Sequence, residues 1–243
     1  MNCHHYSENR CHSCSWIGLD YPWQVKQKET HLRQQLEQFY TSRISKNMPS
    51  LSPTLTSSQS SFRNKAKMVA LGAAHQATLG IINHQGDQVS LTDCLLYTPK
   101  MQQLLHYLET WIQKAGIPPY NVQKRKGELK FIIVHENLEG KFLIRLVVRS
   151  LLRLHRIREH IPLIQAAFPS VEVISLNLQP EHQAILEGPE EIYLTEQEFI
   201  TENLNGVPLC IQPGCFFQTN STTAEKLYHM AATWVQSQLQ TMK

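Results

Sequence analysis

The clearest hydrophobic pattern in the chain lies over residues 99–115, where apolar side chains recur every three or four positions. Met101, Leu104 and Leu108 fall on one face, which predicts an amphipathic helix, and Gly116 follows as a stop signal. Similar periodicity with start signals predicts three more helices, over residues 20–40, 153–168 and 221–240.

Alternating apolar and polar positions predict strands between these helices. "LKFIIVHE" and "KFLIRLVVRS" flank the turn sequence "NLEG" and predict a β-hairpin. Further strands are expected within residues 62–93, which include a turn near Gly86, and at "VEVISLNL" and "EEIYLTE". This order is typical of an α+β fold, with helices on one side of a mostly antiparallel sheet.

Size and composition limit the classes of protein that fit. The chain has 243 residues, of which 42% are hydrophobic, enough for one large domain or two small ones. No apolar run approaches the roughly 20 residues that span a membrane, and the polar start is not a secretory signal. We therefore expect no membrane partner and a cytoplasmic location, where structural disulfides are rare.

The six cysteines then call for another explanation, and metal ligation is the first to consider. Cys3, Cys11 and Cys14 form a C-x7-C-x2-C group, and Cys94 follows about eighty residues later. Structural zinc usually takes a second close pair, whereas three close thiols with one distant thiol are typical of iron–sulfur clusters. Spacing alone leaves a cluster, zinc and no metal open, with Cys94 in the last case a buried packing residue.

Neighbouring residues could contribute to such a site. His4, His5 and His12 are possible zinc ligands, although we expect them to be solvated loop residues. Cys210 and Cys215 lie in "LCIQPGC" without a second close pair, and we expect them to be packing thiols.

Basic residues are clustered although the net charge is only +3. Arg63, Lys65 and Lys67 recur at period two and would leave one face of a strand, forming a cationic ribbon suited to a phosphate backbone. Two further clusters are Lys124, Arg125, Lys126 and Lys130, and Arg145 with Arg149. Each alone could be a solvated face, but the three together favour contact with folded RNA.

Several motifs occur in an order known from one family. "C-x7-C-x2-C-x-W", "FRNKAKMV", "LTDC", "PYNVQKRKGELKFI", "EIYLTEQ" and "FFQTN" run from residue 1 to about 240. On these motifs the chain resembles the RNA uracil-C5 methyltransferases, in their branch that acts on bacterial 23S ribosomal RNA.

The resemblance implies a 4Fe-4S cluster on Cys3, Cys11, Cys14 and Cys94, S-adenosylmethionine as methyl donor, and Gln218 of "FFQTN" as a donor contact. It implies 23S ribosomal RNA as partner, no DNA, and a monomer. It also divides the chain into five parts. The first three are an iron–sulfur knot (1–19), a helix that packs on the methyltransferase domain (20–40) and a Ser/Thr-rich linker (41–61). A central RNA-binding α+β domain that supplies Cys94 (62–208) and the beginning of a Rossmann-like methyltransferase domain (209–243) follow.

The chain departs from the family pattern in its catalytic parts. The family adds a cysteine to uracil C6 so that C5 can attack the donor methyl group. The printed sequence contains no glycine-rich donor loop after a strand, no Asn-Pro-Pro and no Ser-Cys-Asn. We therefore assign no catalytic residue and expect the chain alone to be inactive, as a fragment, a truncated reading frame or a deliberately shortened protein.

Besides a part of an enzyme, two other classes of function are considered. One is a non-catalytic RNA-binding module in which an iron–sulfur cluster or zinc acts only as a staple. The other is an electron carrier, which the three basic clusters do not favour.

Overall fold

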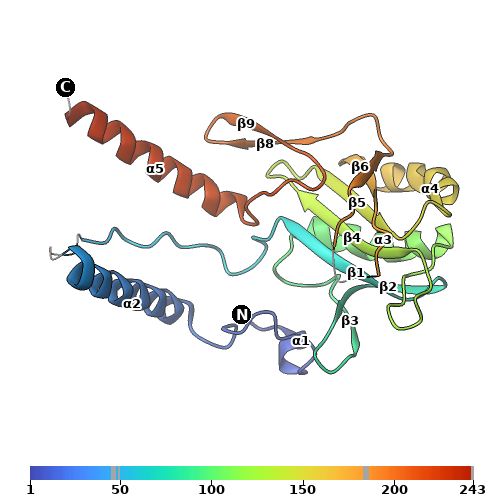
Figure 1. Cartoon of the computed structure of the whole chain (residues 1–243), viewed down its shortest axis with the longest axis horizontal. Helices are drawn as coiled ribbons and strands as arrows, with labels where there is room; N and C mark the ends of the chain where they lie inside the picture. Colours follow the sequence, from blue (N-terminus) through green and yellow to red (C-terminus); the bar gives the residue numbers. More distant parts are fainter. Residues whose placement is uncertain (45–47, 49, 183–185, 242–243) are drawn as a thin grey trace.

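The computed structural model describes residues 1–44, 48, 50–182 and 186–241, and it contains a large sheet with helices around it (Figure 1). The helices are α1 (His4–Ser7), α2 (Tyr21–Phe39) with a π-helical extension (Tyr40–Ile44), α3 (Pro99–Ala115), α4 (Leu154–Ala167) and α5 (Ser221–Thr241). The strands are β1 (Lys65–Ala73), β2 (Gln76–Ile82), β3 (Gln88–Ser90), β4 (Leu129–Glu136), β5 (Phe142–Val148), β6 (Val171–Leu178), β7 (Glu190–Tyr193), β8 (Ile200–Leu204) and β9 (Val207–Ile211).

The large sheet has the order β3-β2-β1-β4-β5-β6-β7. Its neighbours pair antiparallel except β5 and β6, which are parallel because α4 carries the chain back between them. The predicted hairpin about "NLEG" is β4–β5, and the turn near Gly86 joins β2 to β3. The α+β class with a mostly antiparallel sheet is confirmed.

Helices α3 and α4 cover one face of the sheet. The stripe predicted on α3 is fully buried there, together with Ala66 and Met68 of β1. The indole N–H of Trp111 donates to the carbonyl of His160 at 2.8 Å, which joins the two helices. Thr98 caps α3 by accepting from the amide of Met101.

The opposite face carries a hairpin, β8–β9, that we did not predict. Its turn is Asn205-Gly206, with φ of 52° and 79°, and Asn-Gly between two apolar runs is a strong hairpin signal. Ile200 and Ile211 of this hairpin pack on Leu143 and Val173 of the sheet. The predicted domain boundary at 208/209 therefore falls inside β9.

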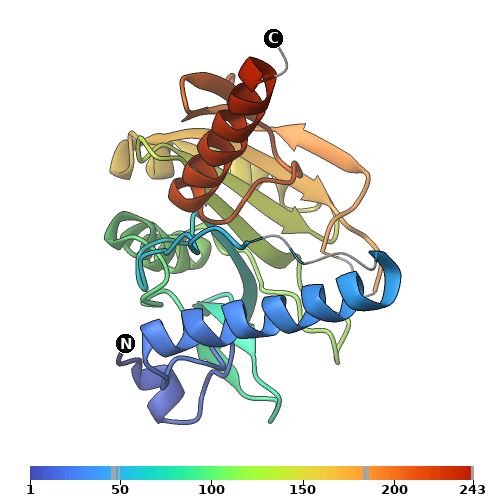
Figure 2. The ribbon, with the colours of Figure 1, turned by 90° about the vertical axis from the view of Figure 1, so that its left-hand side faces the viewer.

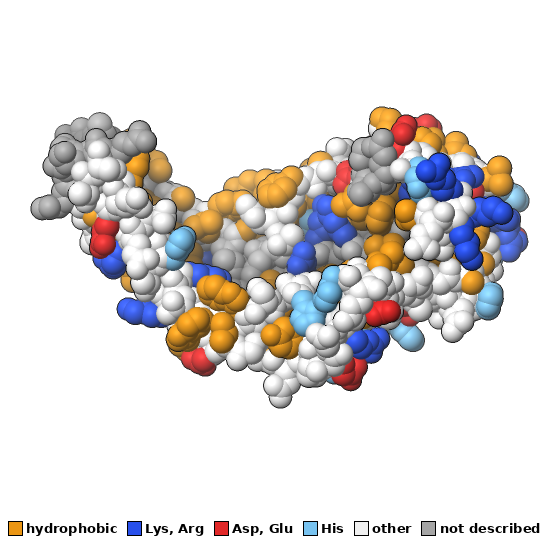
Figure 3. All heavy atoms as spheres, turned by 60° about the horizontal axis from the view of Figure 1, so that its bottom comes forward, with side chains coloured by type: hydrophobic (Ala, Val, Ile, Leu, Met, Phe, Trp, Pro, Cys, Tyr) orange, Lys and Arg blue, Asp and Glu red, His pale blue; other side chains and the backbone are white. Residues whose placement is uncertain are grey.

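Helices α2 and α5 project from this body on one side (Figures 1 and 2). No residue of α2 is buried, and Leu32 and Phe39 are about half exposed. On α5, Leu227, Trp234 and Val235 are exposed by 52%, 53% and 60%. Hydrophobic side chains therefore gather along the projecting helices (Figure 3), and the described residues leave both apolar stripes uncovered.

The predicted 41–61 linker can be compared with the structure only in part. Residues 45–47 and 49 lie outside the described residues, and residues 41–44 belong to the π-helix that extends α2. Within the described part of the chain, every helix is too short or too polar to cross a membrane.

Candidate metal site and basic surface

The structure brings together the four cysteines that the sequence singled out. Cys3 precedes α1, Cys11 and Cys14 follow it, and Cys94 lies in the loop between β3 and α3. All four are free and half-buried, and the thiols of Cys3, Cys11 and Cys14 are close enough to Cys94 to help raise its pKa. The fold therefore places the two cysteine-bearing segments beside each other.

The thiols lie at the edge of the main core, and this changes their acidity. Cys11 and Cys94 pack against the apolar cluster under α3. Burial raises the pKa of Cys94 to about 11, and the three other thiols add to the rise. Burial also raises the pKa of Cys14, while the nearby guanidinium of Arg63 lowers it. A metal that binds here has to displace protons from these thiols.

A histidine holds the two cysteine-bearing segments together. His5 is only 4% exposed, and its Nε2 lies 2.7 Å from Oδ1 of Asp93, the residue before Cys94. Its carbonyl accepts from the amides of Arg10 at 2.8 Å and Cys11 at 3.0 Å. His5 therefore fixes the Cys11 turn through its backbone and the Cys94 loop through its ring. Our expectation that it is solvated was wrong, whereas His4 and His12 are exposed.

The same residues form a small ligand-like group. His4 Nε2 lies 3.2 Å from the second oxygen of Asp93, so His4, His5 and Asp93 have ligand atoms within 4.8 Å of one another. In the described part of the chain, Nδ1 of His5 is buried without a hydrogen-bond partner. A metal on Nε2 would force the proton onto that orphaned nitrogen, so a hydrogen-bonded clamp fits better than a metal site.

The predicted cationic ribbon is present on the face opposite α3 and α4. Lys65 and Lys67 leave β1 on the side away from Ala66 and Met68, and Arg63 precedes the strand. Arg63 and Lys67 are exposed, whereas Lys65 is half-buried and donates to the carbonyl of Cys215 at 3.1 Å. Burial, with the charge of Lys67 beside it, lowers the pKa of Lys65.

Two residues assigned to RNA contact are buried and paired inside the protein, which corrects that prediction. Arg145 is 5% exposed, and its guanidinium donates to both oxygens of Glu191 at 2.6–3.0 Å. Lys130 is 4% exposed and donates to Gln179 Oε1 and to the carbonyl of Glu181. Neither ammonium nor guanidinium faces solvent, so we remove both from the candidate surface.

The other basic residues predicted to contact RNA form a second patch, separate from the ribbon. Lys124, Arg125 and Lys126 are exposed on the turn before β4, and Arg149 reaches this turn by donating to the carbonyl of Arg125 at 3.1 Å. Lys65 pairs with the opposite end of β4, so the patch lies about 20–25 Å from the ribbon along the strand.

The "FFQTN" segment is tied to the ribbon by Asn64, which sequence reasoning did not single out. Its amide nitrogen donates to the carbonyl of Gln218 at 2.9 Å and to Ser221 Oγ at 2.7 Å, and its backbone N–H donates to Thr219. Ser221 in turn donates to the buried carboxylate of Glu202 at 2.7 Å. Gln218 itself is exposed, so its side chain is open to a ligand.

The remaining cysteines differ from expectation. Cys210 and Cys215 are both exposed, so the prediction that they are packing thiols was wrong. Cys210 lies on the β8–β9 hairpin and Cys215 in the loop after it, where few apolar side chains surround them.

The fold is similar to that of the Pyrococcus abyssi tRNA (uracil-54, C5)-methyltransferase, solved in complex with S-adenosyl-L-homocysteine, with a TM-score of 0.68. The two share 18% sequence identity, and the match covers 92% of this chain and 50% of that chain. No protein-family model matches the sequence.

Curated relatives are more similar to this chain in sequence than this solved structure is. The chain is 48% identical over 236 residues to "23S rRNA (uracil(747)-C(5))-methyltransferase RlmC" of Shewanella sp. (strain ANA-3) and 47% identical over 241 residues to that of Vibrio cholerae serotype O1 (strain M66-2). Each match covers 97% of this chain, which spans about 60% of the length of these relatives. The resemblance to the RNA uracil-C5 methyltransferases is thereby confirmed.

Proposed function

We propose that this chain is the metal-bearing and RNA-facing part of an enzyme that methylates carbon 5 of uridine 747 in 23S ribosomal RNA, acting in the cytoplasm as a monomer. The observation that carries the proposal is the identity of 47–48% to the curated RlmC relatives over 97% of the chain. The convergence of the four cysteines beside a cationic strand adds support from the structure.

The four thiols fit a 4Fe-4S cluster better than a single zinc ion. Sulfurs around one zinc at about 2.3 Å would lie less than 4 Å apart. Among the described residues, the one group of three ligand atoms within 4.8 Å is His4, His5 and Asp93, so the cysteine sulfurs are spread more widely. Cys3, Cys11, Cys14 and Cys94 would hold the cluster, which would supply a rigid link between the N-terminus and the sheet.

The uncovered helices support a further domain. Helices α2 and α5 project on the same side of the body (Figure 1) and each carries exposed apolar side chains, as expected if both pack on a methyltransferase domain. Gln218, beside the start of α5, would contact S-adenosylmethionine there. We assign no catalytic residue within these 243 positions, and we infer that this polypeptide alone does not transfer methyl groups.

The metal proposal is tested by the visible spectrum and iron content of anaerobically purified chain. We expect a brown protein whose visible absorption fades under dithionite. Cys94→Ser should lose the iron, whereas the matched control Cys210→Ser, at an exposed cysteine, should keep it. A colourless protein with stoichiometric zinc would overturn the cluster and leave the zinc-stapled RNA-binding module, our alternative.

RNA binding is tested through its salt dependence. Lys67→Ala should reduce the slope of log K against log salt by roughly one for each phosphate that the variant no longer neutralises. Lys114→Ala, an exposed lysine in the last turn of α3 on the other face, is the control and should leave the slope unchanged. Equal slopes for the two variants would show that the ribbon does not touch phosphate.

A further inference from the structure

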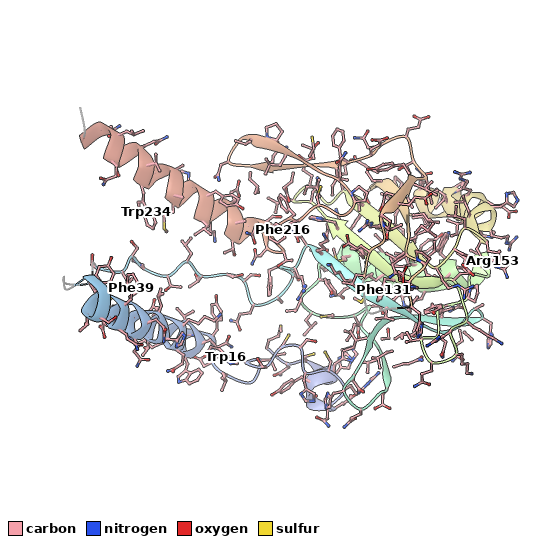
Figure 4. All side chains as sticks on the ribbon, viewed as in Figure 1. Trp16, Phe39, Phe131, Arg153, Phe216 and Trp234 are labelled. Carbon is pink, nitrogen blue, oxygen red and sulfur yellow. The ribbon has the colours of Figure 1, made fainter. Side chains whose placement is uncertain are left out.

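A pocket of about 520 Å³ lies between the cysteine-rich N-terminus, the first turns of α2 and the segment that precedes β1. This volume falls in the range of small-ligand sites. Trp16, Tyr21 and Phe62 give it aromatic walls, and Cys14 and Asn220 line it at the side of the cysteines and of the "FFQTN" segment. Figure 4 places Trp16 close to the beginning of α2.

The aromatic walls remain accessible. Trp16 is 39% exposed, and Lys28 Nζ lies over its ring, 5.8 Å from the ring centre. Trp23 packs on Trp16 with ring centres 6.0 Å apart and the ring planes tilted by 59°, and holds the indole from the α2 side. Partly exposed aromatic side chains of this kind bind nucleobases by stacking.

Positive charge continues from the pocket along the protein surface. Arg63 directly follows Phe62, which lines the pocket, and lines the adjoining hollow together with Phe62. Its Nε donates to the carbonyl of Lys65 at 3.4 Å, so its side chain extends toward β1. The exposed Lys67 continues the ribbon from there. A ligand with a flat ring in the pocket and phosphates on either side would match this arrangement.

The pocket also has a free polar group. Gln59 lines it, is exposed, and its side chain makes no hydrogen bond among the described residues. An amide offers both donors and an acceptor, which can pair with the edge of a base.

We propose that this pocket binds one unstacked nucleobase of single-stranded RNA, with Trp16 as the stacking surface and Arg63 beside the adjoining phosphate. The proposal rests on the proposed RNA-binding function and adds a specific base site to it. Single-stranded RNA is commonly recognised in this way, by stacking splayed bases on aromatic side chains.

The experiment compares two oligomers of equal charge on the full, metal-loaded chain. One is a uridine hexamer, and the other is a hexamer of abasic ribose phosphates. If a base stacks on Trp16, the uridine hexamer should bind roughly 5- to 100-fold more tightly, the range expected for one stacked base. Fluorescence anisotropy of labelled oligomers measures both affinities.

Variants assign the effect to the pocket. Trp16→Ala should bind the two hexamers equally, Trp16→Phe should keep most of the preference, and Lys28→Met should weaken it several-fold. Trp234→Ala, at a tryptophan of α5 that is 53% exposed, is the matched control and should behave as the unmodified chain. Iron content and far-ultraviolet circular dichroism are recorded for each variant, because Trp16 lies close to Cys14.

The outcomes distinguish a failure of the base pocket from a failure of the proposed RNA-binding function. Equal affinity of the unmodified chain for both hexamers, or a full preference in folded Trp16→Ala, would overturn the base pocket and leave RNA binding intact. Binding of neither hexamer would overturn the RNA-binding function itself.

Discussion

His135 gives the sharpest test of the packing between the sheet and the "FFQTN" segment. It lies at the end of β4, is 2% exposed, and its ring is 5.6 Å from that of Phe217. Its Nε2 has no hydrogen-bond partner in the described part of the chain. Burial, followed by the positive charge of Lys65, lowers the pKa of His135 from 6.5 to about 4.

This shift makes stability depend on pH in one direction. Between about pH 6.5 and pH 4 the unfolded chain binds a proton at this position that the folded chain refuses, so the free energy of unfolding falls as the pH falls. At about 1.4 kcal/mol for each pKa unit, His135 should cost about 2 kcal/mol by pH 5 and about 3 kcal/mol by pH 4.

The assay is urea unfolding of the unmodified chain and of His135→Leu at several pH values from 7.5 to 4. Glu136 and Glu202, whose pKa values are raised by burial, are present in both proteins and cancel in the difference. The variant should become the relatively more stable protein as the pH falls. A constant difference between His135→Leu and the unmodified chain would refute the reasoning.

Two further substitutions test the clamp and the corrected arginine. His5→Ala removes the 2.7 Å contact with Asp93, so it should lower the free energy of unfolding by about 1–3 kcal/mol and speed the release of metal to a chelator, measured by absorbance. His155→Ala, at an exposed histidine of α4, is the control and should do neither. Equal rates for the two variants would contradict the clamp. Arg145→Met leaves the largely buried carboxylate of Glu191 without its main partner, so the free energy of unfolding in urea should fall by about 3–5 kcal/mol. The slope of RNA affinity against salt should not change. A smaller salt slope at unchanged stability would show that Arg145 contacts RNA after all.

Local patterns predicted the fold where one physical signal dominated. The stripe on α3 and the alternation in β4 and β5 are long and regular, and both elements formed where expected. The β8–β9 hairpin was missed although Asn205-Gly206 marks its turn, because its strands of five residues carry little periodicity.

The cysteines of the candidate site were predictable from the sequence, whereas the residues that support them were less so. Cysteine spacing and the family resemblance singled out the thiols that the fold brings together. Charge clusters could not show that Arg145 and Lys130 are buried, because their partners come from distant segments around residues 179–191. The clamp between His5 and Asp93 joins positions 88 residues apart, and no local pattern encodes such a contact.

That separation has a consequence for synthesis on the ribosome. Chains grow at roughly 5 to 20 residues per second, so the 88 residues between His5 and Asp93 take roughly 4 to 18 seconds to follow. For most of that interval the three N-terminal thiols have been synthesised while the fourth has not. The nascent chain therefore passes through a stage in which an incomplete thiol cluster is open to oxidants and stray metal ions, and translation speed sets how long that stage lasts.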